Sequence, residues 1–123
     1  MSWRLTKRGR FEAAHVLPHH DGKCARLHGH SFEVEIEIAG GLLHDQGPKS
    51  GMLMDFADLD RPLDRLIEQR LDHWYLNEST GLGDPTSEEL ARWIYNQLKP
   101  DLLELVAVTV EETCTSRARY EPT

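Results

Sequence analysis

The stretch CARLHGHSFEVEIEIA, residues 24–39, alternates between two kinds of side chain from Arg26 onward. One parity carries imidazole, aromatic and aliphatic groups, namely His28, His30, Phe32, Val34, Ile36 and Ile38. The other parity carries Ser31, Glu33, Glu35 and Glu37. Because successive side chains of a β-strand point to opposite faces, this pattern predicts a long strand over residues 26–39 with one buried and one polar face.

The segments on either side of this strand supply its expected neighbours. Residues 3–16 predict an earlier antiparallel strand, in which Phe11, Ala13 and His15 alternate with Glu12 and Ala14. Downstream, the polar and glycine-rich loop DQGPKSG at residues 45–51 precedes MLMDF at residues 52–56. We expect MLMDF to return as the second strand of a hairpin.

Two later segments have the period of an amphipathic helix. The first carries apolar residues at Leu59, Leu63, Leu66, Ile67 and Leu71. Asp55 or Asp58 is its expected N-cap, and Pro62 would lie near the first turn, where proline is best tolerated. The second helix is predicted to begin at the capping box TSEE, residues 86–89, and to end before Pro100.

Two short strands are predicted to close the chain. Val106, Val108 and Val110 alternate with more polar neighbours, and residues 116–120 fit a final strand. The order strand, strand, helix, helix, strand, strand indicates an α+β fold, with one four-stranded antiparallel sheet covered on one face by two helices. The glutamate-bearing face is either solvated or buried in a water-filled interface between subunits.

Composition limits the classes of function. With 123 residues, 39% of them hydrophobic and 28% charged, residues 1–123 are expected to form one soluble domain. The charged start and the presence of only two cysteines, Cys24 and Cys114, favour the cytoplasm, where both stay as thiols. A net charge of −7 argues against a nucleic-acid binder. Lys23 and Arg26 are the first candidates for a local basic patch that binds a small anion.

His28 and His30 share one face of the predicted strand, which makes them candidate metal ligands. His15 would supply a third imidazole from the neighbouring strand, and three histidines leave a tetrahedral zinc one open position. The alternative is that the two rings only pack and form hydrogen bonds. The metal hypothesis is favoured because the rings interrupt an apolar face, where polar groups without partners cost about 1–3 kcal/mol each.

Three further polar residues or pairs have two interpretations each. Cys24 is either a fourth ligand that closes a structural site or a thiol that acts as base or nucleophile beside the metal. Asp72 and His73 are either a solvated helix end or a pair that passes a proton to or from Cys24. Glu112, at an apolar parity, either follows the end of its strand or binds a heterocycle edge with two donors.

Six segments resemble, in sequence and in order, the 6-pyruvoyl-tetrahydropterin synthase family. They are FEAAH at 11–15, CARLHGHSF at 24–32, MDFADL at 54–59, LDHWYLN at 71–77, DPTSEEL at 84–90 and EETCTS at 111–116. The resemblance implies a T-fold, in which the sheets of neighbouring subunits join into an oligomeric barrel with active sites at subunit interfaces. It also implies a trimer-based homo-oligomer such as a hexamer.

The resemblance also assigns roles to individual residues. It implies a zinc ion bound by His15, His28 and His30, with Cys24 as proton acceptor and Asp72 and His73 as its relay. It implies that Glu112 anchors a pterin ring and shares in proton relay, and that Thr86 and Ser87 contribute to the pterin pocket from an adjacent subunit. The sequence departs from the bacterial members at Asp84, where they carry Asn.

The implied substrate is 7,8-dihydroneopterin triphosphate, and the implied activity is that of a zinc-dependent lyase. The three residues between Cys24 and His28 resemble the bacterial carboxy-forming branch, which releases triphosphate and acetaldehyde and acts in queuosine biosynthesis. Cys24 itself argues against the members that act on dihydroneopterin for folate, which carry Glu there. The alternatives are a pyruvoyl-forming synthase and a non-catalytic, zinc-stabilised binding module.

Overall fold

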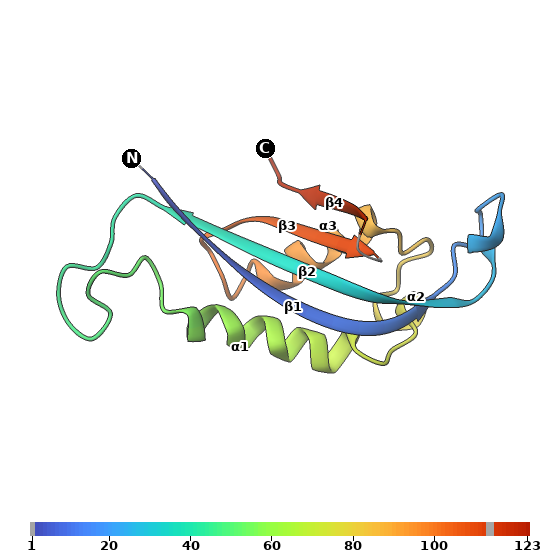
Figure 1. The fold of residues 1–123 in the computed structure, drawn as a ribbon, viewed down its shortest axis with the longest axis horizontal. Helices are drawn as coiled ribbons and strands as arrows, with labels where there is room; N and C mark the ends of the chain where they lie inside the picture. Colours follow the sequence, from blue (N-terminus) through green and yellow to red (C-terminus); the bar gives the residue numbers. More distant parts are fainter. Residues whose placement is uncertain (1, 113–114) are drawn as a thin grey trace.

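The computed structural model describes residues 2–112 and 115–123, and these form a four-stranded antiparallel sheet with helices packed on one face. The strands are β1 (Trp3–His15), β2 (His28–Gly40), β3 (Leu105–Glu112) and β4 (Ser116–Tyr120), in the spatial order β1-β2-β3-β4. Figure 1 shows that β1 and β2 are the long strands of the sheet. The predicted strand order and α+β class are therefore confirmed.

The connecting segments are mostly helical. They are η1 (Lys23–Ala25), α1 (Phe56–Leu66), the π-helix η2 (Ile67–Leu71), α2 (Leu76–Ser79) and α3 (Ser87–Leu98). The predicted caps are confirmed: the Asp55 side chain accepts from Ala57 N, and Thr86 Oγ1 accepts from Glu89 N at 3.1 Å. The short helix α2 was not predicted.

The apolar parity of β1 and β2 faces the helices and forms the core. The register places Phe11 opposite Phe32 and Leu5 opposite Ile38, and the two phenylalanine rings stack with centroids 4.9 Å apart. Leu59 and Leu63 of α1 and the apolar side of α3 are buried against this face. The hydrophobic effect therefore fixes which face of the sheet the helices cover.

Three details differ from the sequence predictions. MLMDF is not a strand, because residues 52–55 continue a loop that folds back on itself through hydrogen bonds between His44 and residues 51 and 52. Pro62 lies in the second turn of α1 rather than near its first, because the helix begins at Phe56. A bulge opposite Glu37 and Ile38 gives Leu105 the core position and leaves Val106 only partly buried.

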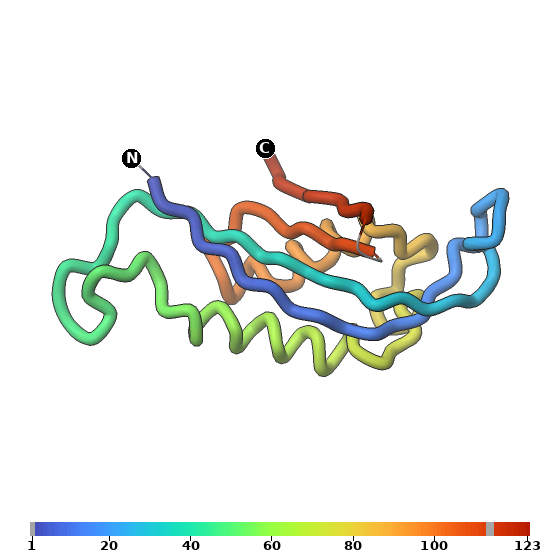
Figure 2. Tube along the Cα trace, in the orientation of Figure 1, coloured from blue at the N-terminus to red at the C-terminus, as the bar shows by residue number. Residues whose placement is uncertain are grey.

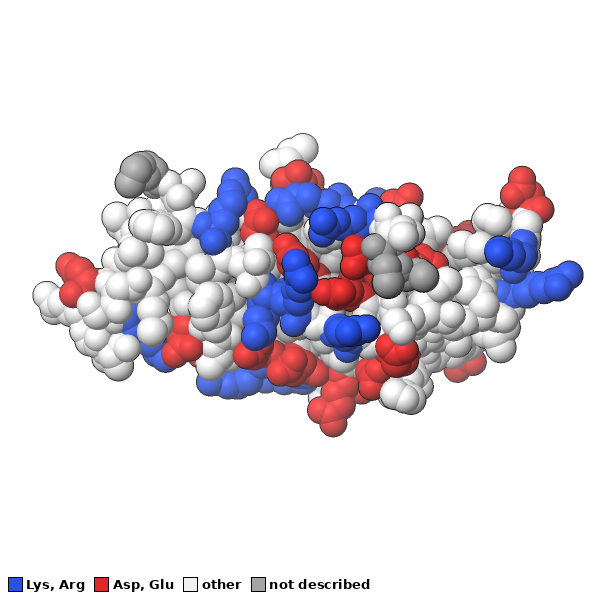
Figure 3. All heavy atoms as spheres, in the orientation of Figure 1, with Lys and Arg blue, Asp and Glu red and all other residues white. Residues whose placement is uncertain are grey.

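The opposite face of the sheet is charged, and its glutamates on β2 pair with arginines of β1 and β4. Arg8 lies 3.2 Å from Glu35, while Glu37 pairs with Arg4 at 2.7 Å and Arg119 at 3.0 Å. Figure 3 shows acidic and basic side chains interleaved over the middle of this face. The arginines therefore offset part of the negative charge of the glutamates that the sequence places on this face.

The two long loops lie at opposite ends of the sheet, as the trace in Figure 2 shows. The loop between β1 and β2 lies at the end that carries the histidines, and the loop before α1 lies at the other end. None of the described helices is long and apolar enough to cross a membrane. Cys114 lies outside the described residues.

Candidate metal centre

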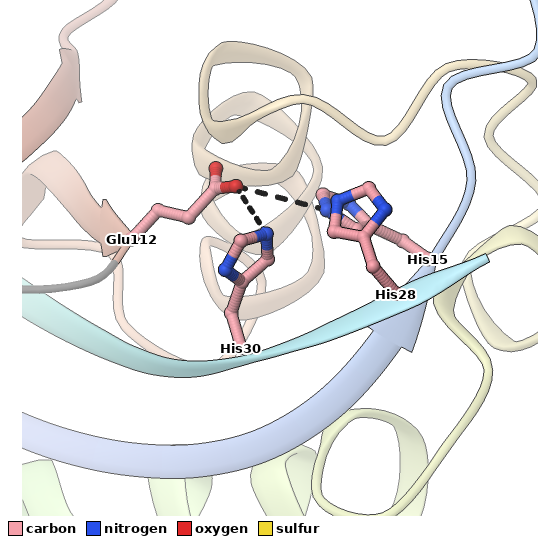
Figure 4. Close-up of side chains that lie close together, drawn as sticks. All are labelled: His15, His28, His30 and Glu112. Carbon is pink, nitrogen blue, oxygen red and sulfur yellow. Dashed lines mark ion pairs between the residues drawn. The ribbon is translucent and has the colours of Figure 1, made fainter. Parts of the chain in front are cut away.

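The three histidines of the sequence prediction meet at one end of the helix-covered face. His15 and His28 are directly paired across β1 and β2, and His30 pairs with Ala13 on the same face. The end of β3 adds Glu112, which lies opposite Phe32. One ligand atom from each of the four side chains lies within 4.8 Å of the others, and Figure 4 shows the side chains converging.

Backbone carbonyls orient two of the imidazoles. His15 Nδ1 lies 2.9 Å from the Pro85 carbonyl oxygen, and His28 Nδ1 lies 2.6 Å from that of Arg26. A carbonyl oxygen can only accept, so each Nδ1 must carry the proton and each Nε2 keeps a lone pair. Both Nε2 atoms are buried and have no hydrogen-bond partner among the described residues. In metal sites, a hydrogen bond from the other ring nitrogen to a carbonyl fixes the orientation of the histidine ligand in this way.

The electrostatics of His15 favour the form that binds a metal. Its side chain is fully buried, and this burial lowers the pKa of the imidazole because it disfavours the charged ring. A neutral imidazole is the form that coordinates a cation. The cluster offers three imidazoles and one carboxylate, and the buried Nε2 atoms of His15 and His28 each keep a lone pair. Such ligands fit a divalent metal, and zinc is among the ions that they bind.

Glu112 lies between the imidazoles and the start of α3. Its Oε1 lies 2.7 Å from His30 Nε2 and 3.7 Å from His15 Nε2, while Ser87 Oγ donates to its Oε2 at 2.8 Å. The family resemblance implies that Ser87 reaches the pterin pocket from an adjacent subunit, whereas this bond joins Ser87 to Glu112 of the same chain. No sequence pattern links two positions 25 residues apart, so only the packing of α3 on β3 reveals this bond.

Cys24 lies beside the cluster rather than in it. It occupies η1 as a half-buried free thiol and lines a cleft of about 400 Å³ together with His28 and His30. Its carbonyl accepts from Leu17 N at 2.9 Å, which closes the loop. Within the described residues, the side chain that accompanies the three imidazoles is Glu112 and not Cys24.

Asp72 and His73 form a dyad directly after the π-helix. Asp72 Oδ2 lies 2.8 Å from His73 Nδ1, and its Oδ1 accepts from Glu12 N at 2.8 Å. The bond from Glu12 N, aided by His73, lowers the pKa of the Asp72 carboxyl, which therefore stays ionised. His73 has φ 62°, a left-handed conformation that is costly for a residue with a side chain and is often found at functional sites.

The dyad lies on the outer edge of β1. Hydrogen bonds from His73 N to Glu12 O and from Ala14 N to Trp74 O attach this segment to the strand edge. The His73 side chain is 80% exposed. The dyad is thus hydrogen-bonded to the edge of β1, the strand that carries His15. The side chain of His73 points toward solvent and not into the described cluster.

Thr86 and Asp84 flank the residue that orients His15. Thr86 caps α3, and its neighbour Pro85 supplies the carbonyl that binds His15 Nδ1. Asp84 Oδ2 lies 2.9 Å from His19 Nδ1, which connects this segment to the loop that carries Cys24. The segment before α3 therefore contacts both His15 and the loop between β1 and β2.

The comparisons with known proteins agree with this arrangement. A family model described as 6-pyruvoyl tetrahydropterin synthase matches residues 4–123. The chain is 51% identical to the 6-carboxy-5,6,7,8-tetrahydropterin synthase of Synechocystis sp. over 119 residues, which cover 96% of the chain and 92% of that protein. It is 34% identical to the protein of the same description from Haemophilus influenzae, with coverage of 97% and 99%.

The fold is also found among solved structures. That of the Caenorhabditis elegans 6-pyruvoyl tetrahydropterin synthase superposes with a TM-score of 0.85 at 26% identity, covering all of this chain and 97% of that one.

Proposed function

Because the chain belongs to the 6-pyruvoyl tetrahydropterin synthase family, we propose that it is a lyase of the carboxy-forming type. It converts 7,8-dihydroneopterin triphosphate and one water molecule into 6-carboxy-5,6,7,8-tetrahydropterin, acetaldehyde and triphosphate, a reaction of queuosine biosynthesis. The observation that carries the proposal is the cluster of imidazoles with two unsatisfied Nε2 lone pairs, in a chain 51% identical to a relative of that description.

His15, His28 and His30 hold the metal in this proposal, and the metal is zinc. When bound, zinc supplies a Lewis acid that stabilises negative charge on the hydroxyl oxygens of the substrate side chain. The protein contributes the orientation of the ligands, because the Pro85 and Arg26 carbonyls hold two of the rings by their Nδ1 atoms.

Cys24 is the proposed base. Its thiolate removes a proton from the substrate side chain in the cleft that it shares with His28 and His30. Asp72 and His73 adjust the protonation of the thiol. Since His73 points to solvent from a strand edge, we propose that a neighbouring subunit completes this relay.

Glu112 is the proposed anchor of the pterin ring and shares in proton relay, with Thr86 and Ser87 as further members of the pocket. Ser87 supports this role because its hydroxyl holds one carboxylate oxygen, so the other can meet a donor of fixed position. The heterocycle then lies at the α3 side of the cluster. If the ring bound both oxygens of Glu112, the Ser87 hydroxyl would have to release Oε2 or share it with the ring.

The proposed assembly is a trimer-based homo-oligomer, either a trimer or a hexamer. The outer edge of β4 has no strand neighbour in the described sheet, and the same is true of the first two thirds of β1. Joining such edges would enclose the charged face in a barrel. The proposal places residues 1–123 in one domain and the enzyme in the cytoplasm.

The decisive experiment is to incubate the zinc-loaded protein with 7,8-dihydroneopterin triphosphate and identify the products. We expect acetaldehyde and 6-carboxytetrahydropterin. A pyruvoyl product without acetaldehyde would instead support the second candidate, a 6-pyruvoyl-tetrahydropterin synthase. The absence of turnover would leave only a zinc-stabilised binding module.

The roles of Cys24 and the histidines are separable by two variants. Cys24→Ala should lower kcat by about 10²–10⁴-fold, the usual size of general acid–base help, and should retain its zinc. His28→Ala should lose both zinc and activity. The measurements are steady-state kinetics and zinc content by mass spectrometry, and zinc loss in Cys24→Ala would make the thiol a ligand.

A further inference from the structure

We propose that Lys23 and Arg26 form the subsite that binds the polyphosphate tail of the substrate. This inference rests on the proposed function, since it assumes a ligand with a polyphosphate group. It also assigns an orientation to the bound substrate. The polyphosphate tail extends from the histidine cluster toward the β1–β2 loop, and the pterin ring lies toward α3.

One cleft beside the histidine cluster is lined both by histidines and by the two cations. Its volume is about 400 Å³, and it is lined by Lys23, Cys24, Arg26, Leu27, His28, Gly29 and His30. The lining contains no carboxylate. A ligand that meets the histidines with its hydroxyls and Cys24 with its carbon-bound hydrogens would therefore extend along a wall that carries only positive formal charge.

A second cleft beside Glu112 has the opposite character. It also measures about 400 Å³, but Ser87, Glu88, Glu112, Ser116, Arg117 and Ala118 line it. Two carboxylates face one guanidinium there, so a polyphosphate would meet net repulsion, whereas a ring with hydrogen-bond donors would meet acceptors. The difference in charge between the two clefts favours one orientation of the substrate.

Lys23 and Arg26 are available to bind an anion. Arg4, Arg8 and Arg119 on the sheet are already paired with glutamates. Lys23 and Arg26 are exposed and have no ion-pair partner among the described residues. Lys23 and Arg26 differ from the other cations of the chain in lining the cleft that contains Cys24 and His28.

The backbone holds both cations in position. Arg26 N donates to Lys23 O at 3.0 Å across η1, and this bond closes the tight turn between the two cations. The Arg26 carbonyl in turn accepts from His28 Nδ1 at 2.6 Å. The basic side chains are therefore attached to the same short segment that orients a histidine of the cluster, as binding of a tail next to the metal requires.

The test measures binding of inorganic triphosphate to the zinc-loaded oligomer by isothermal titration calorimetry. In the variant Lys23→Gln/Arg26→Gln, we expect the affinity to fall by about 10- to 100-fold per cation removed, as for other charge-assisted hydrogen bonds. The variant Lys23→Arg/Arg26→Lys should keep most of the affinity. Arg65→Gln is the matched control, because Arg65 is an exposed cation on α1 outside both clefts.

Zinc content, measured before and after titration, shows whether each variant is folded and loaded. Unchanged affinity for triphosphate in the double variant, or an equal loss in Arg65→Gln, would overturn the subsite. Kinetics with the full substrate provide a second readout: kcat/KM should fall, because the cations hold the tail that departs as triphosphate. If triphosphate binding depends on the cations but the substrate is not turned over, the proposed function fails and the subsite stands.

Discussion

One face of the β1–β2 pair is built from different chemistry at its two ends. At one end Leu5 lies opposite Ile38, and in the middle Phe11 stacks on Phe32, so these contacts are complete within the chain. At the other end His15 lies opposite His28, and both Nε2 atoms are buried without a hydrogen-bond partner in the described structure. The difference teaches that the apolar end specifies the fold, while the imidazole end leaves two buried lone pairs available to a ligand.

The largest expected effect on stability is at the apolar part of this face. Phe32→Ala should lower the free energy of unfolding by about 3–5 kcal/mol, because Phe32 is fully buried and stacks on Phe11. Urea denaturation measures the change. Ile36→Val, at a buried site of the same face, should cost only about 0.5–1.5 kcal/mol. Equal costs would mean that the ring stack is not the centre of the core.

Removal of the metal should have the next largest effect. If free zinc is 100 to 1,000 times its Kd, the bound ion stabilises the fold by about 2.7–4.1 kcal/mol, so chelation should lower Tm accordingly. His28→Ala should abolish this shift, whereas Ile38→Val, at the far end of the same face, should keep it. A zinc-dependent shift that survives in His28→Ala would place the ion elsewhere.

The smallest expected effect concerns the charged face behind the apolar end. Glu37→Gln should cost about 1–3 kcal/mol at neutral pH, because the Glu37 carboxylate is buried and binds two arginines. The bond from Arg119, and then that from Arg4, lowers the pKa of Glu37 below its ordinary value of 4.5. The unfolded chain therefore binds the proton first, and the stabilisation is present above pH 4.5 and lost as pH falls below it.

Urea denaturation at a series of pH values checks this sign. The difference in unfolding free energy between the natural protein and Glu37→Gln should shrink as pH falls below the ordinary value. Glu104→Gln provides the control, because Glu104 is exposed and has no ion pair among the described residues. A difference that grows on acidification would contradict the assigned partners.

Much of the fold follows from short patterns. The parity of β2, the cap at Thr86 and the end of the second helix are local features, and local sterics and hydrogen bonding set them. The prediction of a strand at residues 52–56 was wrong, because short patterns do not show how a loop packs. An apolar run indicates that its side chains are buried. A loop that packs on the core buries them as well as a strand does.

The sequence by itself determined that His28 and His30 share one face, because strand periodicity is a property of consecutive residues. The register of β1 on β2 then placed His15 opposite His28. Only the tertiary structure decided that Glu112 reaches the histidines while Ser87 holds its second oxygen, and that Cys24 stands beside the cluster. It also decided which carbonyls orient His15 and His28. The physical reason is that these contacts depend on how β3, α3 and the loops pack, and packing joins residues that no local period relates.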